Sequence, residues 1–569
     1  MRLKLCFVLL LLTAWGIRLN AQKISGEIAG QEALEDKYWV FLTDKGDFSK
    51  YEPGEILSER ALERRARMNI ALDETDYPVV EAYVQAIGAV GATVRHPSKW
   101  FNAVSVKMDA ATRAKVEALP FVKSVRAIPK VKRDLEPLQA MRVGYDVGFT
   151  GNQLTMLGLD QLHQNGYNGT GVLIAVMDNG FSQVNENPYL NHLFLDDRVL
   201  ATYDFVNDEV DVYNQGSHGH WVLTIMAGWY EEEIDPNFNF YGSAHGATYI
   251  LCHTEDDQHE WSQEEDNWVA AMEYADSLGA DVFNTSLGYR DLDNDNDGIF
   301  EFDYGYEGMD GNTTIITRGA DRAAAKGIVV VNSAGNSGQN KISAPADGDS
   351  VIAVGAVDSL GVIAGFSSRG PSFDGRIKPD VCAMGRQTSY VRVGGGLAQG
   401  NGTSFSSPMI AGLLACILQA PNTGTNMQLY DALIRSSHLY ETPDSNYGYG
   451  IPNGPMAFDL FHGEPLQEIL DPASFSTDGI DAFPVPTDEN LYIAVDNEVL
   501  GFSGDLELWD SYGRLINRIQ VEVAPFYNLF RLQRSVHYPN AAGGRYVVRI
   551  RDRETKLVRY TKRVVILDH

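Results

Sequence analysis

Ser404 stands in the segment NGTSFSSPMIAGLLACILQA, residues 401–420, where a polar stretch gives way to an apolar one. Apolar residues recur at helical spacing from Met409 to Leu418, which predicts a buried helix. The start of a helix carries unpaired N–H groups and partial positive charge, which suit a serine whose substrate becomes an oxyanion. Serines also cap helices without doing chemistry. A nucleophilic Ser404 therefore requires a base and an acid elsewhere in the chain.

Both groups have a candidate. A serine hydroxyl becomes nucleophilic when an adjacent base takes its proton, and that base is usually a histidine oriented by a carboxylate. His218 lies in SHGHWVLTIMAG, just before an apolar helix, and Asp178 ends the apolar run GVLIAVMD. A carboxylate at the carboxyl end of a buried parallel strand lies on the face of the sheet where ligands bind. The three residues follow one another as Asp, His and Ser.

These segments resemble the signature blocks of the subtilisin-like serine peptidases. AVMDNG, SHGHWV and NGTSFSSPMIAG match the blocks of the catalytic aspartate, histidine and serine, in the chain order of subtilisin. VVVNSAGNSG resembles the oxyanion-hole segment, and NTSLGY resembles the substrate-binding strand. The resemblance runs from about Gln153 to Asn453. It implies a serine endopeptidase that acts on proteins and peptides through an acyl-enzyme.

The resemblance also implies a role for each residue. Ser404 attacks the peptide carbonyl, His218 takes and returns the proton, Asp178 orients the imidazole, and Asn336 donates to the oxyanion. The implied substrate-binding residues are Ser286, Leu287, Gly288, Ser333, Ala334 and Gly335. No cofactor is required for this chemistry.

Two features raise the question of metal binding. His220 stands where the family usually has threonine, so a His218–His220 metal pair is a minor alternative. In DLDNDNDGIFEFD, Asp293, Asp295 and Asp297 match the first half of a calcium loop, but Tyr304 occupies the twelfth position, where glutamate closes such loops. A structural calcium site and a solvated acidic loop both remain open. His245, His253 and His259 have no spacing that builds a site, and we expect structural or surface roles.

Composition and the N-terminus point to export. The segment 1–21 has Arg2 and Lys4, an apolar run and a small residue at Ala21, which is the layout of a signal peptide. A net charge of −30 argues against a nucleic-acid partner, and we expect a monomer.

Buried free thiols are expected at Cys252, Cys382 and Cys416, although a single Cys252–Cys382 disulfide is an alternative that the sequence leaves open.

The elements that must position the site form an α/β pattern. Strands and helices alternate over residues 153–462, which predicts a three-layer, subtilisin-like domain with a parallel sheet. Residues 22–130 show an α+β pattern that resembles an inhibitor-type propeptide; a permanent binding domain is the alternative. Residues 131–152 read as a linker.

Residues 463–569 contain short strands with turn signals, which predict an all-β sandwich. FPVPTDENLYI, LELWDSYGRLI, GGRYVVRI and YTKRVVI resemble the sorting domain of the type IX secretion system. That resemblance implies the type IX machinery as a partner and a secreted or outer-membrane surface location, reached through the periplasm. A carbohydrate-binding or stabilising domain is the competing interpretation. For the whole chain, the runner-up is a catalytically silent surface adhesin on a peptidase scaffold.

Overall fold

The computed structural model describes most of the chain. The described residues are 36–128, 148–232, 238–255, 265–289, 305–339, 342–421, 423–463, 480–483, 490–497, 502–510, 515–523, 526–533, 544–556 and 558–566. The predicted signal peptide, most of the predicted linker, His259 and the predicted calcium loop with Asp293, Asp295 and Asp297 lie outside these residues.

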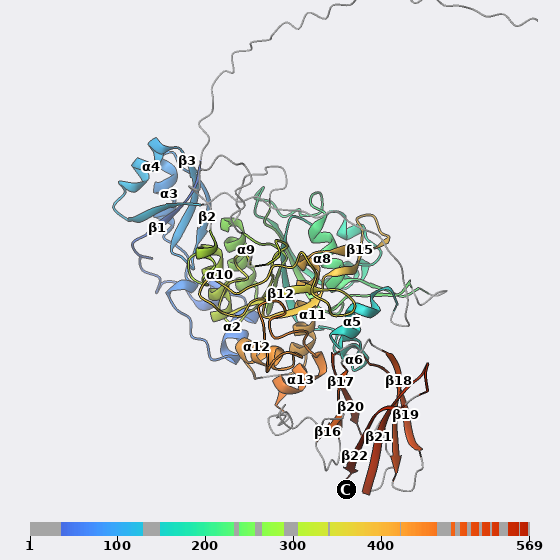
Figure 1. Cartoon of the computed structure of the whole chain (residues 1–569). Coiled ribbons are helices and arrows are strands. Elements are labelled where there is room, and N and C mark those ends of the chain that lie inside the picture. Colours follow the sequence, from blue (N-terminus) through green and yellow to red (C-terminus); the bar gives the residue numbers. More distant parts are fainter. Residues whose placement is uncertain are drawn as a thin grey trace, which may run out of the picture.

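The N-terminal region, blue in Figure 1, is an α+β unit. Four antiparallel strands lie in the order β2-β3-β1-β4. Their bounds are β1 Asp36–Leu42, β2 Thr93–Ser98, β3 Ala103–Met108 and β4 Val122–Ala127, with helices α1 Pro53–Ile56, α2 Glu59–Arg67, α3 Glu81–Ala89 and α4 Ala110–Glu117. Alternate strand residues such as Val104 and Val106 pack with Ile87 of α3 and Val116 of α4 in one core.

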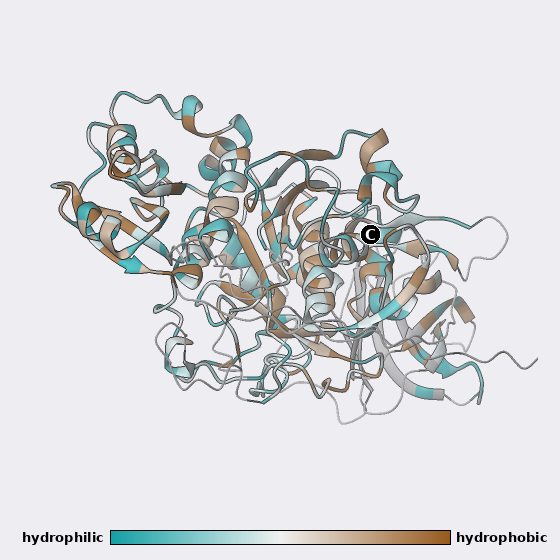
Figure 2. Cartoon of the chain, turned by 90° about the horizontal axis from the view of Figure 1, so that it is seen from above, coloured by the Kyte–Doolittle hydropathy of each residue, from teal (hydrophilic) through white to brown (hydrophobic). Residues whose placement is uncertain are grey.

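A seven-stranded parallel sheet forms the centre of the molecule, in the order β13-β12-β11-β10-β5-β9-β6. Its strands are β5 Leu173–Asp178, β6 Val199–Asp204, β9 Thr248–His253, β10 Val282–Thr285, β11 Val329–Ser333, β12 Val351–Val357 and β13 Val381–Met384. All six residues of β5 are buried. Parallel strands covered on both faces are expected to be apolar throughout, and Figure 2 shows the central strands largely in brown.

Helices cover both faces of this sheet (Figure 1). They are α8 His218–Ala227, α9 Glu265–Leu278, α10 Ile315–Ala325, α11 Thr403–Leu418, α12 Asn426–Arg435 and α13 Gly454–His462. The alternation along β5 assigns the faces: Ile174 and Val176 share a core with α8 and α11, whereas Leu173 and Ala175 share the other core with α9 and α10. The predicted three-layer α/β fold is confirmed.

Shorter elements surround the sheet. They are α5 Gly151–Met156, α6 Leu159–Gln164, α7 Asn191–Leu195, β7 Trp229–Tyr230, β8 Phe240–Tyr241, β14 Arg386–Val391, β15 Leu397–Asn401 and the 3₁₀ turns Glu74–Asp76, Gly148–Thr150, Val184–Glu186 and Tyr306–Gly308. Cys252, Cys382 and Cys416 are buried free thiols, as predicted, so no Cys252–Cys382 disulfide forms. Within the described parts of the chain, no helix combines the length and the apolar composition needed to cross a membrane.

The C-terminal region, red in Figure 1, consists of two antiparallel sheets. One sheet has the order β16-β17-β20 and the other β19-β18-β21-β22. Their strands are β16 Ile480–Phe483, β17 Asn490–Asn497, β18 Phe502–Asp510, β19 Leu515–Val523, β20 Phe526–Gln533, β21 Gly544–Asp552 and β22 Val558–Ile566. The described residues of this region contain strands and no helix, which confirms the predicted all-β class.

Candidate active site

Asp178 and His218 meet where a strand ends and a helix begins. Asp178 is the last residue of β5, and His218 is the first residue of α8. Nδ1 of His218 lies 2.7 Å from Oδ1 of Asp178, and both side chains are buried. Oδ1 of Asn179 accepts from the backbone N–H groups of His218 and Gly219, at 3.1 and 3.2 Å. The end of β5 therefore holds the first turn of α8 in place.

Gly219 makes this close approach possible. A Cβ added at Gly219 would lie 2.4 Å from the carbonyl oxygen of Gly180 and 2.9 Å from Cβ of Asp178. Contacts this short are not tolerated, so any larger residue at 219 would push α8 away from the end of β5. The absence of a side chain at Gly219 therefore allows Asp178 and His218 to come within hydrogen-bonding distance.

Ser404 lies in the first turn of α11, and it is not the helix cap. The cap position is Gly402, which makes no side-chain capping bond. The neighbouring serines have other partners: Ser406 donates to the carbonyl oxygen of Thr403 at 2.9 Å, and Ser407 donates to Asn284 at 2.8 Å. The capping interpretation of Ser404 is therefore wrong.

Helices α8 and α11 bring the histidine and the serine to one place. The ring of His218 lies 6.2 Å from that of Phe405, which follows Ser404, and the two rings are stacked. Ser404 itself is 8% exposed and His218 is 6% exposed. Both residues therefore sit in a shielded position that still reaches the surface.

Asn336 is oriented by Thr403. Oδ1 of Asn336 accepts from the backbone N–H of Thr403 at 2.9 Å and from its hydroxyl at 3.0 Å. Since the amide oxygen is occupied on that side, the Nδ2 donors point away from Thr403. The Thr403 hydroxyl also accepts from the N–H of Gly335 at 3.1 Å. The sequence interpretation gave Thr403 no role; its only signal was its place directly before Ser404.

Three polar groups surround the space left empty by Gly402. A Cβ built on Gly402 would lie 2.8 Å from Oγ of Ser404, 3.6 Å from Nδ2 of Asn336 and 3.7 Å from the backbone N of Ser404. Gly402 has φ +146°, a backbone conformation that favours glycine. A hydroxyl and two N–H donors around one empty point are the parts that an attacking oxygen and a developing oxyanion require.

The two predicted substrate-binding segments follow adjacent parallel strands, β10 and β11. Nδ2 of Asn332 donates to the carbonyl oxygen of Leu287 at 3.0 Å, which ties the segments together. Ser286 Oγ donates to the backbone carbonyl of Ser404 at 3.0 Å, which ties them to α11. The fold thus gathers Ser286–Gly288 and Ser333–Gly335 at the catalytic edge of the sheet.

Ser343 lies between these two segments. A Cβ added at Gly288 would lie 2.4 Å from Oγ of Ser343, and one added at Gly335 would lie 3.0 Å from the same oxygen. Ser343 also donates to the carbonyl oxygen of Ala334 at 3.3 Å. The sequence interpretation did not include Ser343, because no motif surrounds it.

Comparisons with known proteins agree with this arrangement. Residues 169–450 match the subtilase family of S8 peptidases. Subtilisin E of Bacillus subtilis (strain 168) is 30% identical over 376 residues, which cover 64% of this chain and 83% of the relative. The chain belongs to the subtilase family. It is therefore a serine endopeptidase, and the family requires no cofactor for catalysis.

Further relatives are consistent with this assignment. Subtilisin of Bacillus pumilus is 33% identical over 301 residues, covering 51% of this chain and 92% of the relative. The thermophilic serine proteinase of Bacillus sp. (strain AK1) is 27% identical over 397 residues, covering 68% of this chain and 88% of the relative. Residues 37–140 match the peptidase S8 propeptide domain of Bacteroidota, so the N-terminal α+β unit of this subtilase is a propeptide.

His220 is structural in this subtilase. Its Nδ1 lies 2.6 Å from the carbonyl oxygen of Ser182, and its Nε2 lies 2.9 Å from Nδ2 of Asn187. Nδ1 therefore donates and Nε2 accepts, so both ring nitrogens are used and the ring is neutral. Burial lowers the pKa of His220, which favours the same state. A His218–His220 metal pair is excluded by these bonds.

A second buried Asp–His pair lies beside the Asp178–His218 pair. Nδ1 of His253, at the end of β9, lies 2.8 Å from Oδ2 of Asp204, at the end of β6. His253 is also the residue opposite Asp178 in the β5–β9 register. Burial lowers the pKa of His253, but Asp204 and Glu255, through hydrogen bonds and charge, together raise it overall. The role expected for His253, structural or surface, is thus structural.

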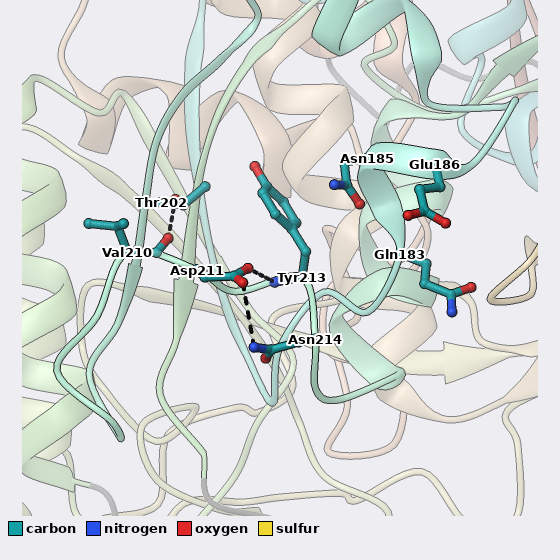
Figure 3. A pocket seen from close by; sticks show the side chains of 8 residues that line it. All are labelled: Gln183, Asn185, Glu186, Thr202, Val210, Asp211, Tyr213 and Asn214. Carbon is teal, nitrogen blue, oxygen red and sulfur yellow. Dashed lines mark hydrogen bonds between the residues drawn. The ribbon is translucent and has the colours of Figure 1, made fainter.

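A hollow of about 440 Å³ lies on the segment that connects Asp178 to His218 (Figure 3). It is lined by Gln183, Asn185, Glu186, Thr202, Val210, Asp211, Tyr213 and Asn214. Asp211 accepts from the N–H of Tyr213 at 2.9 Å, which shapes one wall. None of the predicted catalytic or substrate-binding residues lines this hollow. Across the described segments, no three His, Cys, Asp or Glu side chains are grouped to hold a metal ion.

Proposed function

We propose that this subtilase hydrolyses peptide bonds in protein substrates through Asp178, His218 and Ser404. His218 takes the proton of Ser404 at Nε2 while Oγ attacks the substrate carbonyl. Asp178 accepts from Nδ1–H, keeps Nε2 free as the base, and stabilises the imidazolium that forms. His218 then gives its proton to the leaving amine, and water hydrolyses the acyl-enzyme by the same steps.

The tetrahedral oxyanion is assigned to the space beside Gly402. Nδ2 of Asn336 and the backbone N–H of Ser404 face this space, and both are donors. The substrate chain is assigned to Ser286–Gly288 and Ser333–Gly335, whose backbone groups lie along the same edge. Convergence of the Ser404 hydroxyl and two N–H donors on one point, next to a buried Asp–His pair, is the observation that carries the proposal.

A serine-directed covalent inhibitor tests the proposal. A fluorophosphonate should label Ser404 and stop casein hydrolysis, and peptide mass mapping should place the adduct on that residue. Ser404→Ala should take no label. A catalytically silent adhesin predicts no labelling and no hydrolysis by the processed wild-type chain. The intact set of Asp178, His218, Asn336 and Ser404 disfavours that alternative.

We further propose that the chain is made as an exported precursor. Its proposed parts are a signal peptide (1–21), a propeptide (22–130), a linker (131–152), the peptidase (153–462) and a sorting domain (463–569). Autocatalysis cuts between about Arg126 and Gln153, and the monomeric enzyme ends shortly after His462. Mass spectrometry of the secreted enzyme tests this: one active chain still holding Tyr38 and His569 would contradict it.

The C-terminal sheets are proposed as the type IX sorting signal. Deleting the residues from about Asp471 onward should trap active peptidase in the periplasm of a host that has this machinery. Secretion unaffected by the deletion, together with binding of the isolated segment to polysaccharide, would favour a carbohydrate-binding domain instead.

Calcium is proposed as a structural ligand of Asp293, Asp295 and Asp297. The support is their spacing alone, because the loop lies outside the described residues. A chelator should lower the melting temperature of the Ser404→Ala chain, and Asp295→Asn should remove that response. Identical melting curves with and without the chelator would indicate that the segment is a solvated acidic loop that binds no calcium.

A further inference from the structure

The propeptide contacts the peptidase domain through two adjoining surfaces that share α9. At the first, residues 95–100 cover α9: Arg95 pairs with Asp266 at 2.8 Å. Glu273 of α9 accepts from the hydroxyl of Ser98 at 2.6 Å and from the N–H of Trp100 at 3.1 Å. The second surface is made by α2, which the blue chain in Figure 1 reaches after leaving the β1–β4 sheet.

Helix α2 lies across the C-terminal ends of α9 and α10. Arg60 Nε donates to the carbonyl oxygen of Gly279 at 3.1 Å. Arg64 donates to the carbonyl oxygens of Ala280 and, at 3.3 Å, of Lys326. These carbonyls lie one or two residues beyond α9 and α10, whose C-terminal ends carry partial negative charge, so two helix ends face a basic helix. The contacts are therefore electrostatically complementary as well as close.

Carboxylates complete the surface. Arg64 and Arg65 both pair with Asp276, the latter at 2.8 Å, while Arg60 pairs with Asp281. The side chains of Arg64 and Arg65 are only 1% and 2% exposed, and that of Asp276 is fully buried. Arg60 and Arg64, at positions i and i+4, are neighbours on one face of α2, and Arg65 follows directly after Arg64. We name Asp276, Gly279, Ala280, Asp281 and Lys326 the arginine socket.

A further carboxylate of the propeptide fixes the same network. Asp76 accepts from Arg65 at 2.6 Å and from Nζ of Lys326 at 3.0 Å. Asp76 is fully buried. At this surface the propeptide therefore contributes a carboxylate as well as arginines, and the peptidase contributes Lys326 as well as carboxylates. Removing one partner of a buried pair leaves an uncompensated charge, which makes such a network hard to open.

The arginine socket lies far from Ser404. Asp281 precedes β10, whereas the substrate-binding Ser286 follows it, so the length of the strand separates them, roughly 15 Å. Lys326 likewise precedes β11, whose other end leads to Ser333–Gly335. The contact of α2 is thus on the edge of the sheet opposite the catalytic one, and none of its residues belongs to the linker.

We propose that the arginine socket is an exosite that retains the severed propeptide, with α2 as its partner. The proposal rests on the proposed function, which supplies the cut. Two linked contacts rebind each other at high effective concentration, so the anchor at α2 keeps the propeptide near the catalytic edge after cleavage. The strength of this anchor therefore sets how quickly the severed propeptide leaves.

The decisive experiment does not depend on the enzyme's own activity. An exogenous protease site placed within residues 131–147 of the Ser404→Ala chain allows the propeptide to be cut by an added protease. The severed propeptide should co-elute with the peptidase in size-exclusion chromatography. Arg60→Gln and Asp281→Asn should each speed its dissociation up to about fivefold, since that pair is partly exposed.

The Arg64→Gln, Arg65→Gln double variant should speed dissociation by about 100-fold or more, because it breaks buried pairs. Should the double variant fail to fold, the milder Arg60→Gln and Asp281→Asn decide the question. Arg113→Gln is the matched control: this propeptide arginine is 41% exposed and pairs with Glu117 inside the propeptide, so dissociation should be unchanged.

Two results would overturn the proposal: a wild-type propeptide that separates at once after cutting, or wild-type dissociation rates in all folded socket variants. In the active chain, the same variants should shorten the lag before casein hydrolysis in the same order. An active chain that neither processes itself nor cleaves casein would instead contradict the proposed function, and the cut Ser404→Ala chain would still report on the socket.

Discussion

Nδ1 of His218 lies 2.7 Å from Oδ1 of Asp178, and this bond decides which nitrogen of the ring can act as the base. A buried carboxylate accepts a hydrogen bond and cannot donate one when ionised, so Nδ1 carries the proton and Nε2 is left with its lone pair. The backbone N–H of Asn179 also donates to the same oxygen, at 2.8 Å, which holds the carboxylate in its orientation. In the proposed mechanism, Asp178 therefore orients the imidazole as well as stabilising its charge.

Asp178→Asn should lower kcat by about 10,000-fold at neutral pH with little change in melting temperature, because the amide can donate to Nδ1 and impose the wrong tautomer. The chain offers a matched control in Asp204→Asn, the same change in the neighbouring Asp204–His253 pair. That control should lower stability and keep kcat within about tenfold of wild type, in keeping with the loss of one structural bond. Equal losses of kcat in both variants would contradict the assignment of Asp178.

Gly402→Ala should stop catalysis by occupying the oxyanion space. The new methyl would lie 2.8 Å from Oγ of Ser404 and 3.6 Å from Nδ2 of Asn336. We expect kcat to fall by at least about 100-fold, the cost of losing an oxyanion donor. Gly394→Ala controls for backbone strain, since Gly394 has positive φ and no atom near its added Cβ. Turnover and melting temperature are measured for both variants. A loss of turnover without a lower melting temperature would show that the methyl group blocks the site and does not unfold the protein.

Asn336→Ala should slow turnover by about 100- to 1000-fold with little change in KM. Thr403→Val should cause a smaller loss, about three- to tenfold, because one hydrogen bond that orients Asn336 disappears. Thr403→Ser keeps the hydroxyl and should restore most of kcat. Initial rates on one peptide substrate give kcat and KM for all three variants. A defect of Asn336→Ala confined to KM would remove Asn336 from the oxyanion hole.

The sequence could nominate the proposed catalytic residues because their chemistry is tied to strand ends and helix starts. Asp178 ends an apolar strand and Ser404 opens an apolar helix, and both patterns are legible over a few residues. The layers of the fold followed from the same local signals: the continuous burial of β5 and the alternating strands and helices. Thr403 and Ser343 were not assigned, since each acts through contacts with segments distant in the chain.

The arginine socket could not have been predicted from the sequence. Helix α2 has the sequence ERALERRAR, and a helix this rich in charged residues most often faces solvent. Arg64 instead reaches Asp276, more than two hundred residues further along the chain. Only the packing of the propeptide against α9 and α10 shows that this charge is buried and paired. The calcium loop stays a prediction because it lies outside the described residues.

Acid should destabilise the folded chain through partly buried histidines that stay neutral in the fold. Burial lowers the pKa of His163, His192 and His438 to about 4, from an ordinary value of 6.5. Between these values the unfolded chain takes up protons that the folded chain refuses, so the free energy of unfolding falls as pH falls through that window.

Urea unfolding of the Ser404→Ala chain, which cannot digest itself, measures this effect from neutral pH down to about pH 4. His438 Nδ1 accepts from the N–H of Ile451 at 2.8 Å, a bond that a glutamine oxygen can also accept. His438→Gln should therefore fold. Its free energy of unfolding should depend less steeply on pH, by a slope equivalent to up to about one bound proton, since glutamine does not titrate. A variant whose unfolding free energy falls as steeply with acid as that of the parent would show that His438 does not contribute to this effect.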